Sequence, residues 1–230
     1  MTSSLQGISS MATRQVLGEL ARAWEQRSGR PVRIESVGGV DAAKRVAAGE
    51  RFDFVVLAAD AIDKLAAAGH VVAGSRMDLV DSGVAVAVKT GTPHPDLSSE
   101  DALRTAVTAA PTIGYSTGPS GVALLALFER WGILQGLQDR LKQAPPGVPV
   151  GALVARGEVA LGFQQLSELI HLEGIDVVGP MPASVQINTT FSGAVCATAS
   201  DAEAVRELLA FMASPDAEAA KRRNGMEPAA

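Results

Sequence analysis

Short apolar runs alternate with helical segments along the first third of the chain. The apolar runs have the length of buried strands, and the segments after them repeat apolar residues at helical spacing. The runs are residues 5–8, 32–37 and 54–57, and the helical segments are 17–24, 41–48 and 62–68. Continuous apolar strands separated by helices predict a parallel sheet covered on both faces, with right-handed crossovers.

A second alternating series fills the middle of the chain. Its predicted strands are 112–115, 159–163 and 175–178, and its predicted helices are 99–109, 120–131, 134–142 and 150–155. Long strand-like stretches at 78–89 and 185–197 flank this series, and helices at 202–212 and 216–223 close the chain. We therefore expect an α/β protein of two lobes, with two mainly parallel sheets flanked by helices and joined by a two-stranded hinge. Lobe one would be residues 1–84 plus 190–230, and lobe two residues 85–189.

Composition excludes several classes of partner. The 230 residues carry a formal net charge of −5 and are 47% hydrophobic but only 4% aromatic. A nucleic acid or an anionic membrane needs a concentrated positive face, so neither is an expected partner. No apolar run has the length of a membrane span, and the single Cys196 excludes an internal disulfide. Residues 1–7 lack the pattern of a secretory signal, which predicts a cytoplasmic protein as written, or a periplasmic one if the N-terminus has been trimmed.

Two turns between a strand and a helix carry small hydroxyl residues and glycines. Ser9 and Ser10 follow the first strand, where either would serve as a helix N-cap or as a donor to a ligand. The second turn runs from residue 115 to 121 and contains Pro119, which fits the first position of a helix. Its candidate ligand-binding residues are Ser116, Thr117, Ser120 and Gly121. Free amides at such a helix start favour an anion.

The remaining candidates are amide and charged side chains. Gln164 and Gln165 end an apolar strand, and Glu168 follows them. The basic candidates are Arg14, Lys44 and Arg45, which are either solvated helix residues or ligands of a carboxylate. Asp60 fits the N-cap of a helix that begins at residue 61. The sequence contains no common nucleotide, hydrolase or metal motif, so we expect neither a cofactor nor a metal.

These segments together resemble the molybdate-binding proteins of bacterial ABC transporters. The resemblance rests on 8–10, 53–60, 118–121, 159–168 and 214–217 and covers nearly the whole chain. It implies the type II periplasmic-binding-protein fold, an ABC permease as partner, and an oxyanion held by hydroxyls and backbone amides. The positions that match the anion site are Ser10, Ala59, Ser120 and the helix start around Val150 or Gly151.

The chain departs from that family at two places. Gly39 and Val40 stand where those proteins usually have a pair of serines, and Gln165 stands where they have a tyrosine. A lost hydroxyl weakens the case for a tetrahedral inorganic ion. Aconitate isomerase, a relative with the same fold, is similar in overall pattern and acts on a tricarboxylate, a substrate that Arg14, Lys44 and Arg45 would suit.

Three functions remain open. The first is a solute-binding protein of ABC-transporter type, which closes its lobes over a small anion such as molybdate or a di- or tricarboxylate. The second is an isomerase of the aconitate type, with Glu168 or Lys44 as general base and the turn at 118–121 stabilising the developing charge. The third is a cytoplasmic ligand-sensing module, although no output domain is visible in the sequence.

Overall fold

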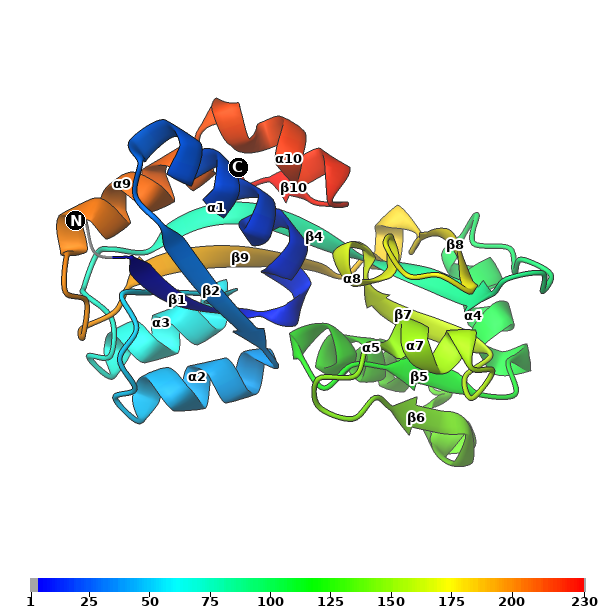
Figure 1. Ribbon diagram of the computed structural model, residues 1–230. Helices are drawn as coiled ribbons and strands as arrows, with labels where there is room; N and C mark the ends of the chain where they lie inside the picture. The colour runs from blue at the N-terminus through cyan, green and yellow to red at the C-terminus, as the bar shows by residue number, and fades with distance from the viewer. Residues whose placement is uncertain (1–3, 230) are drawn as a thin grey trace. The chain divides into compact units, whose positions relative to one another are not determined.

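The computed structural model describes residues 4–229, so part of the N-terminal segment considered above lies outside the described residues. The chain divides into two compact units (Figure 1). Unit 1 contains the chain up to Ser82 and from Thr189 onward, and unit 2 contains Gly83–Asn188. The chain passes between the units inside strand β4 (Met77–Lys89) and returns at the start of strand β9 (Asn188–Val195). The sequence-based boundaries fall after residues 84 and 189.

The sheet of unit 1 has the strand order β2-β1-β3-β9-β4, with β10 paired to β4. The bounds of the remaining strands are β1 Leu5–Ser10, β2 Val32–Val37, β3 Phe54–Ala58 and β10 Glu227–Pro228. Strands β2, β1 and β3 are parallel, whereas β9 runs antiparallel to β3 and β10 antiparallel to β4. The three strands predicted from the first third of the chain are therefore parallel, and the strands added to them make the sheet mixed.

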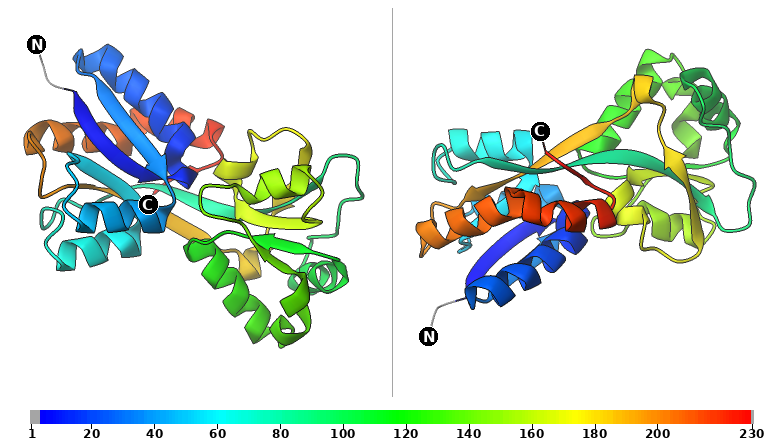
Figure 2. Two further views of the ribbon diagram at one scale, coloured as in Figure 1. Left: turned by 60° about the horizontal axis from the view of Figure 1, so that its bottom comes forward. Right: turned by 90° about the horizontal axis from the view of Figure 1, so that it is seen from above.

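Helices cover both faces of this sheet (Figures 1 and 2). One face carries α1 (Arg14–Ser28), α9 (Ala202–Ala213) and α10 (Glu218–Arg223), and the other carries α2 (Gly39–Ala47) and α3 (Ala59–Ala67). Short 3-10 turns at Met11–Thr13 and Pro215–Ala217 precede α1 and α10. All five residues of β3 are buried because the strand has a hydrophobic layer on each side.

Unit 2 has its own sheet, in the order β4-β7-β5-β6 with β8 also paired to β4. Its other strands are β5 Ile113–Tyr115, β6 Leu141–Gln143, β7 Leu161–Gln165 and β8 Ile175–Pro180. Its helices are α4 Glu100–Ala109, α5 Pro119–Arg130, α6 Leu134–Leu137, α7 Val150–Ala155 and α8 Leu166–Leu169, with 3-10 turns at Gln138–Arg140 and Ala183–Val185. Helices α4 and α5 pack on one face, with α7 and α8 on the other.

One predicted helix is wrong. The segment 134–142 is helical only as far as Leu137, and after a 3-10 turn the chain enters β6, which pairs in parallel with β5. Arg140 holds this turn in place, because its guanidinium donates to the carbonyl oxygens of Thr108 and Ala110 at 2.8 and 2.9 Å. Tertiary pairing therefore overrides the local helical pattern. Among the described residues, no helix combines the length and apolar character needed to cross a membrane.

Gly7 allows β1 to lie against β3. A Cβ added at Gly7 would lie 2.2 to 2.6 Å from ring atoms of Phe54, whose side chain is fully buried. We predict that Gly7→Ala lowers the free energy of unfolding by about 1–3 kcal/mol, the usual cost of overpacking a core. Thermal or urea unfolding measures the change.

Gly18→Ala is the matched control, because a Cβ added at Gly18 in α1 meets nothing within 4 Å. Alanine in a helix should leave stability unchanged or raise it by up to about 1 kcal/mol. Equal stability of Gly7→Ala and the wild type would contradict the close packing of Gly7 on Phe54.

Candidate functional site

The carboxyl ends of three parallel strands lie side by side in unit 1. Ser9 in β1 is in register with Ser36 in β2 and with Val56 in β3. The three strands therefore end at one edge of the sheet, where the 3-10 turn Met11–Thr13, α2 and α3 begin (Figure 1). Ligands of open α/β sheets bind at this kind of edge, because the turns there present free backbone N–H groups.

The two adjacent serines at the end of β1 have different surroundings. Ser9 is fully buried, and its Oγ lies 2.8 Å from Ser36 Oγ and donates to the carbonyl of Ser10 at 3.3 Å. Ser10 is also buried, yet its Oγ has no hydrogen-bond partner among the described residues. Neither serine caps α1 with its side chain, since that helix begins at Arg14. An unpaired buried hydroxyl costs about 1–3 kcal/mol, so Ser10 is the serine with a donor to offer.

Helices α2 and α3 begin beside Ser10 without side-chain caps. Their N-cap residues, Gly38 and Ala58, have no side chain that could accept from the first-turn amides. A Cβ added at Gly39 would lie 3.6 Å from Ser10 Cβ, so the start of α2 lies beside the Ser10 side chain. We call Ser10, Gly39 and Ala59 the strand-end cluster. It combines a hydroxyl donor with two helix starts. The positive ends of these helices favour a small anion, and each first turn also carries a carboxylate, Asp41 in α2 and Asp60 in α3.

The basic side chains on α2 lie away from this cluster. Arg45 donates to Glu35 and Glu50 at 2.5 to 2.9 Å and lies over the ring of Phe52. Its hydrogen bonds hold the pKa values of both carboxyls below their usual range. Lys44 is exposed in the last turn, roughly 7.5 Å along the helix axis from Gly39. The structure therefore places neither residue in the strand-end cluster.

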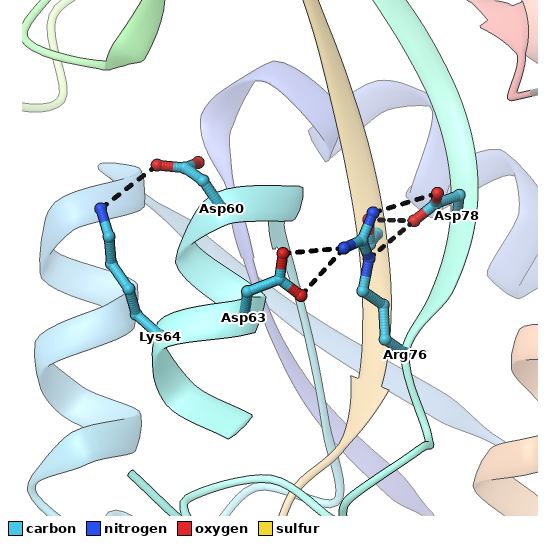
Figure 3. Close-up of polar contacts among 6 residues, drawn as sticks. Asp60, Asp63, Lys64, Arg76 and Asp78 are labelled. Atoms are coloured by element: carbon cyan, nitrogen blue, oxygen red, sulfur yellow. Dashed lines mark hydrogen bonds and ion pairs between the residues drawn. The ribbon is translucent and has the colours of Figure 1, made fainter. Parts of the chain in front are cut away.

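Acidic side chains on α3 form their own ion pairs (Figure 3). Asp60 is the second residue of α3 rather than its N-cap, and it pairs with Lys64 at 3.3 Å. Arg76 joins Asp63 to Asp78 at 2.8 and 3.0 Å. Burial raises the pKa of Asp78, but hydrogen bonds led by that of Arg76 leave it below its usual range. The contacts of Arg76 fasten α3 to β4.

In unit 2, the turn into α5 brings two predicted serines together. The Oγ atoms of Ser116 and Ser120 lie 3.1 Å apart. A Cβ added at Gly121 would lie 2.0 Å from the carbonyl oxygen of Ser116, so only glycine fits there. The amide of Gly121, expected to face a ligand, instead donates to Gly118 at 3.0 Å. Thr117 is exposed at the tip of the turn.

Gln164 occupies the helix start that the resemblance assigned to the ligand. Its Oε1 accepts from the amides of Val150 and Gly151 at 2.7 and 3.4 Å. The expectation that these two amides face an anion is therefore wrong in this structure, because a side chain from the end of β7 already caps them. Gln165 is buried at the same strand end, as the N-cap of α8.

Glu168, on α8, has an unusual carboxyl group. Burial raises its pKa to about 7, although a hydrogen bond with Gln164 acts in the opposite direction. A carboxyl that titrates near neutrality can both accept and release a proton, which is the property of a general acid or base. The neighbouring Ser167 was not among the candidates from the sequence, although its buried Oγ has no partner among the described residues. The signal was a hydroxyl two residues after the end of β7.

The raised pKa of Glu168 predicts a pH-dependent stability. The folded protein holds this proton up to about pH 7, whereas the unfolded chain releases it near its ordinary value of 4.5. Stability should therefore fall as pH rises between these values, because the folded state binds more protons there. In Glu168→Gln this fall in stability with rising pH should be missing. Thermal unfolding from pH 4.5 to 8 measures the difference. A wild-type profile that parallels that of Glu168→Gln would contradict the raised pKa.

Solved structures with this architecture include several anion-binding proteins. A periplasmic molybdate-binding protein from Azotobacter vinelandii matches 96% of this chain and 98% of its own, with a TM-score of 0.77 and 22% identity. A sulfate-binding protein from Mycobacterium tuberculosis matches 98% of this chain and 87% of its own, with a TM-score of 0.78 and 17% identity. At these identities the matches establish the fold, which is that of periplasmic binding proteins, as the sequence predicts.

Two sequence comparisons go further. An aconitate isomerase from a Pseudomonas species is 41% identical over 216 residues, covering 91% of this chain and 82% of its own. The profile of the family described as bacterial extracellular solute-binding protein matches residues 5–227. This chain therefore belongs to the family of bacterial extracellular solute-binding proteins.

Proposed function

We propose that this chain binds a small anion bearing two or three carboxylates. The observation that carries the proposal is the buried hydroxyl of Ser10, which has no partner among the described residues and lies beside the uncapped starts of α2 and α3. A carboxylate would accept from the hydroxyl and from first-turn amides such as those of Gly39 and Ala59. Charge-assisted hydrogen bonds of this type are stronger than neutral ones.

A carboxylate suits the strand-end cluster better than a tetrahedral oxyanion. Gly39 and Val40 bring no hydroxyl to the start of α2, so the cluster offers one side-chain donor and backbone amides. A tetrahedral ion presents four oxygens in one place, whereas a single carboxylate of a larger ligand presents two, which the hydroxyl of Ser10 and the first-turn amides can satisfy. The relative named aconitate isomerase is also nearly twice as similar in sequence as the molybdate-binding structure, at 41% against 22% identity.

We propose an ABC permease as protein partner and the periplasm as the compartment. The family description names extracellular solute-binding proteins, and such proteins deliver their ligand to a transporter. Fractionation of the native host tests the compartment, because the protein should then be recovered from the periplasm.

Ser10→Ala should weaken the binding of trans-aconitate or citrate by roughly tenfold, because one charge-assisted hydrogen bond is lost. Isothermal titration of the purified protein measures this, with molybdate as a comparison ligand. Ser28→Ala, at the far end of α1, is the matched control and should bind like the wild type.

Two results would contradict this proposal. One is unchanged affinity in Ser10→Ala, and the other is tight binding of molybdate with no binding of any di- or tricarboxylate.

Isomerisation of aconitate is a second candidate function. It is favoured by the 41% identical relative and by the near-neutral pKa of the Glu168 carboxyl. In this reaction a base removes a proton from the methylene carbon of aconitate, the double bond shifts by one carbon, and a proton returns to the former vinyl carbon. No electrons are exchanged with another molecule, so one carboxyl that accepts a proton and then returns it is sufficient to catalyse the isomerisation.

Glu168→Gln should abolish this turnover while leaving aconitate binding in place, because glutamine keeps the shape of the side chain but cannot carry the proton. Proton NMR of cis- and trans-aconitate follows the reaction, and wild-type kcat/KM should rise with pH through about 7 as Glu168 ionises. Glu173→Gln, at an exposed carboxyl of unit 2, should retain wild-type activity. Turnover by Glu168→Gln would remove this residue from the reaction, and no turnover by the wild type would leave a binding protein.

A further inference from the structure

A groove of about 490 Å³ lies on unit 1 between helix α1 and strand β2. Residues from both elements line it, among them Arg14, Gly18, Arg22, Glu25, Ile34 and Ser36. Its volume falls within the range of about 300–1,000 Å³ that is usual for small-molecule sites. None of these residues belongs to the strand-end cluster.

Two arginines stand on the α1 side of the groove. Arg14 and Arg22 lie one helical turn before and one after Gly18, so all three follow one stripe of the helix. Both side chains are exposed, and within the described residues neither forms a hydrogen bond or an ion pair. The nearby carboxylate of Glu19 is hydrogen-bonded to Arg223 and Asn224. Its pKa lies below the usual range chiefly because of Arg223, with a smaller contribution from the charge of Arg22. A Cβ added at Gly18 would meet nothing within 4 Å, so the space between the two arginines is open.

The other side of the groove is the outer edge of the sheet. Strand β2 is terminal in the strand order, and the carbonyl of Pro31 points toward β1, where it accepts from Leu5 at 2.9 Å. Backbone groups alternate between the two edges of a strand, so the N–H groups of Val32, Ile34 and Ser36 point outward. A carboxylate already uses this edge, because Glu25 Oε1 accepts from the amide of Val32 at 2.7 Å. The outward amides of Ile34 and Ser36 continue the same row.

We propose that this groove is a second anion site, which binds a di- or tricarboxylate. One carboxylate would accept from the outward amides of Ile34 and Ser36, in the way that Glu25 accepts from Val32. Arg14 and Arg22 would pair with the carboxylates from the helix side. Their Cα atoms are separated by roughly 12 Å along α1, so a ligand with more than one carboxylate would let each arginine pair with a different anionic group above Gly18.

The groove and the strand-end cluster occupy opposite faces of the sheet. Ser36 and Ser9 share the face covered by α1, whereas Ser10 packs against the start of α2 on the other face. The two proposals can therefore fail separately. Amide signals of Ile34 and Ser36 report on the groove, and those of Gly39 and Ala59 report on the cluster.

The test is a titration of the full-length, ¹⁵N-labelled protein with citrate, followed by amide chemical shifts. In the wild type the signals of Ile34 and Ser36 should shift with a saturating curve. Arg22→Gln should raise the dissociation constant from these two signals by roughly fivefold or more, as expected for one charge-assisted contact near solvent. Gly18→Leu should abolish their shifts, because leucine is a good helix former that fills the open groove. Ser10→Ala should leave them unchanged.

Two outcomes would overturn the second site. One is an absence of citrate-dependent shifts at Ile34 and Ser36 in the wild type. The other is an identical titration in the wild type and Arg22→Gln, which decides the question even if Gly18→Leu does not fold.

Discussion

The parallel register of β1, β2 and β3 is the constraint on which the proposed chemistry of unit 1 depends. Because Ser9 aligns with Ser36 and Val56, the three strands end together and two helices start beside Ser10. A shift of one residue would reverse the faces of Ser9 and Ser10. Ser9 would then face α2, and Ser10, with the hydroxyl that is now free, would face α1. Gly7 protects this register, since any larger residue would meet the Phe54 ring.

In unit 2, a single amide side chain links two of the candidate site's features. Gln164 caps α7 through its oxygen and also hydrogen-bonds to Glu168, so one residue connects a helix start with the carboxyl that titrates near neutrality. Because Gln164 occupies the start of α7, the amides there are not free for an anion, although the resemblance to molybdate-binding proteins implied that they would be. A separate hydrogen bond joins Gln164 to the Glu168 carboxyl, whose pKa burial raises to about 7. This exchange of a binding position for a titrating one favours an organic acid as the ligand.

The sequence predicts elements well where burial is continuous, as in β3, and fails where pairing is brief. Nothing local marks residues 141–143 as a strand, because three residues are too few for a period and only their pairing with β5 creates it. Ser9 and Ser10 are equivalent by residue type, and only the three-dimensional faces of the sheet separate their roles. The capping of α7 by Gln164 crosses 14 residues, beyond any local pattern. Likewise, Arg45 looks like a free cation until Glu35 and Glu50 fold beside it.

A crystal structure of the protein with trans-aconitate tests whether Ser10 binds a carboxylate. We predict a ligand carboxylate oxygen about 2.6–3.2 Å from Ser10 Oγ and from at least one first-turn amide of α2 or α3. Ligand bound without any contact to Ser10 or to these two helix starts would contradict it.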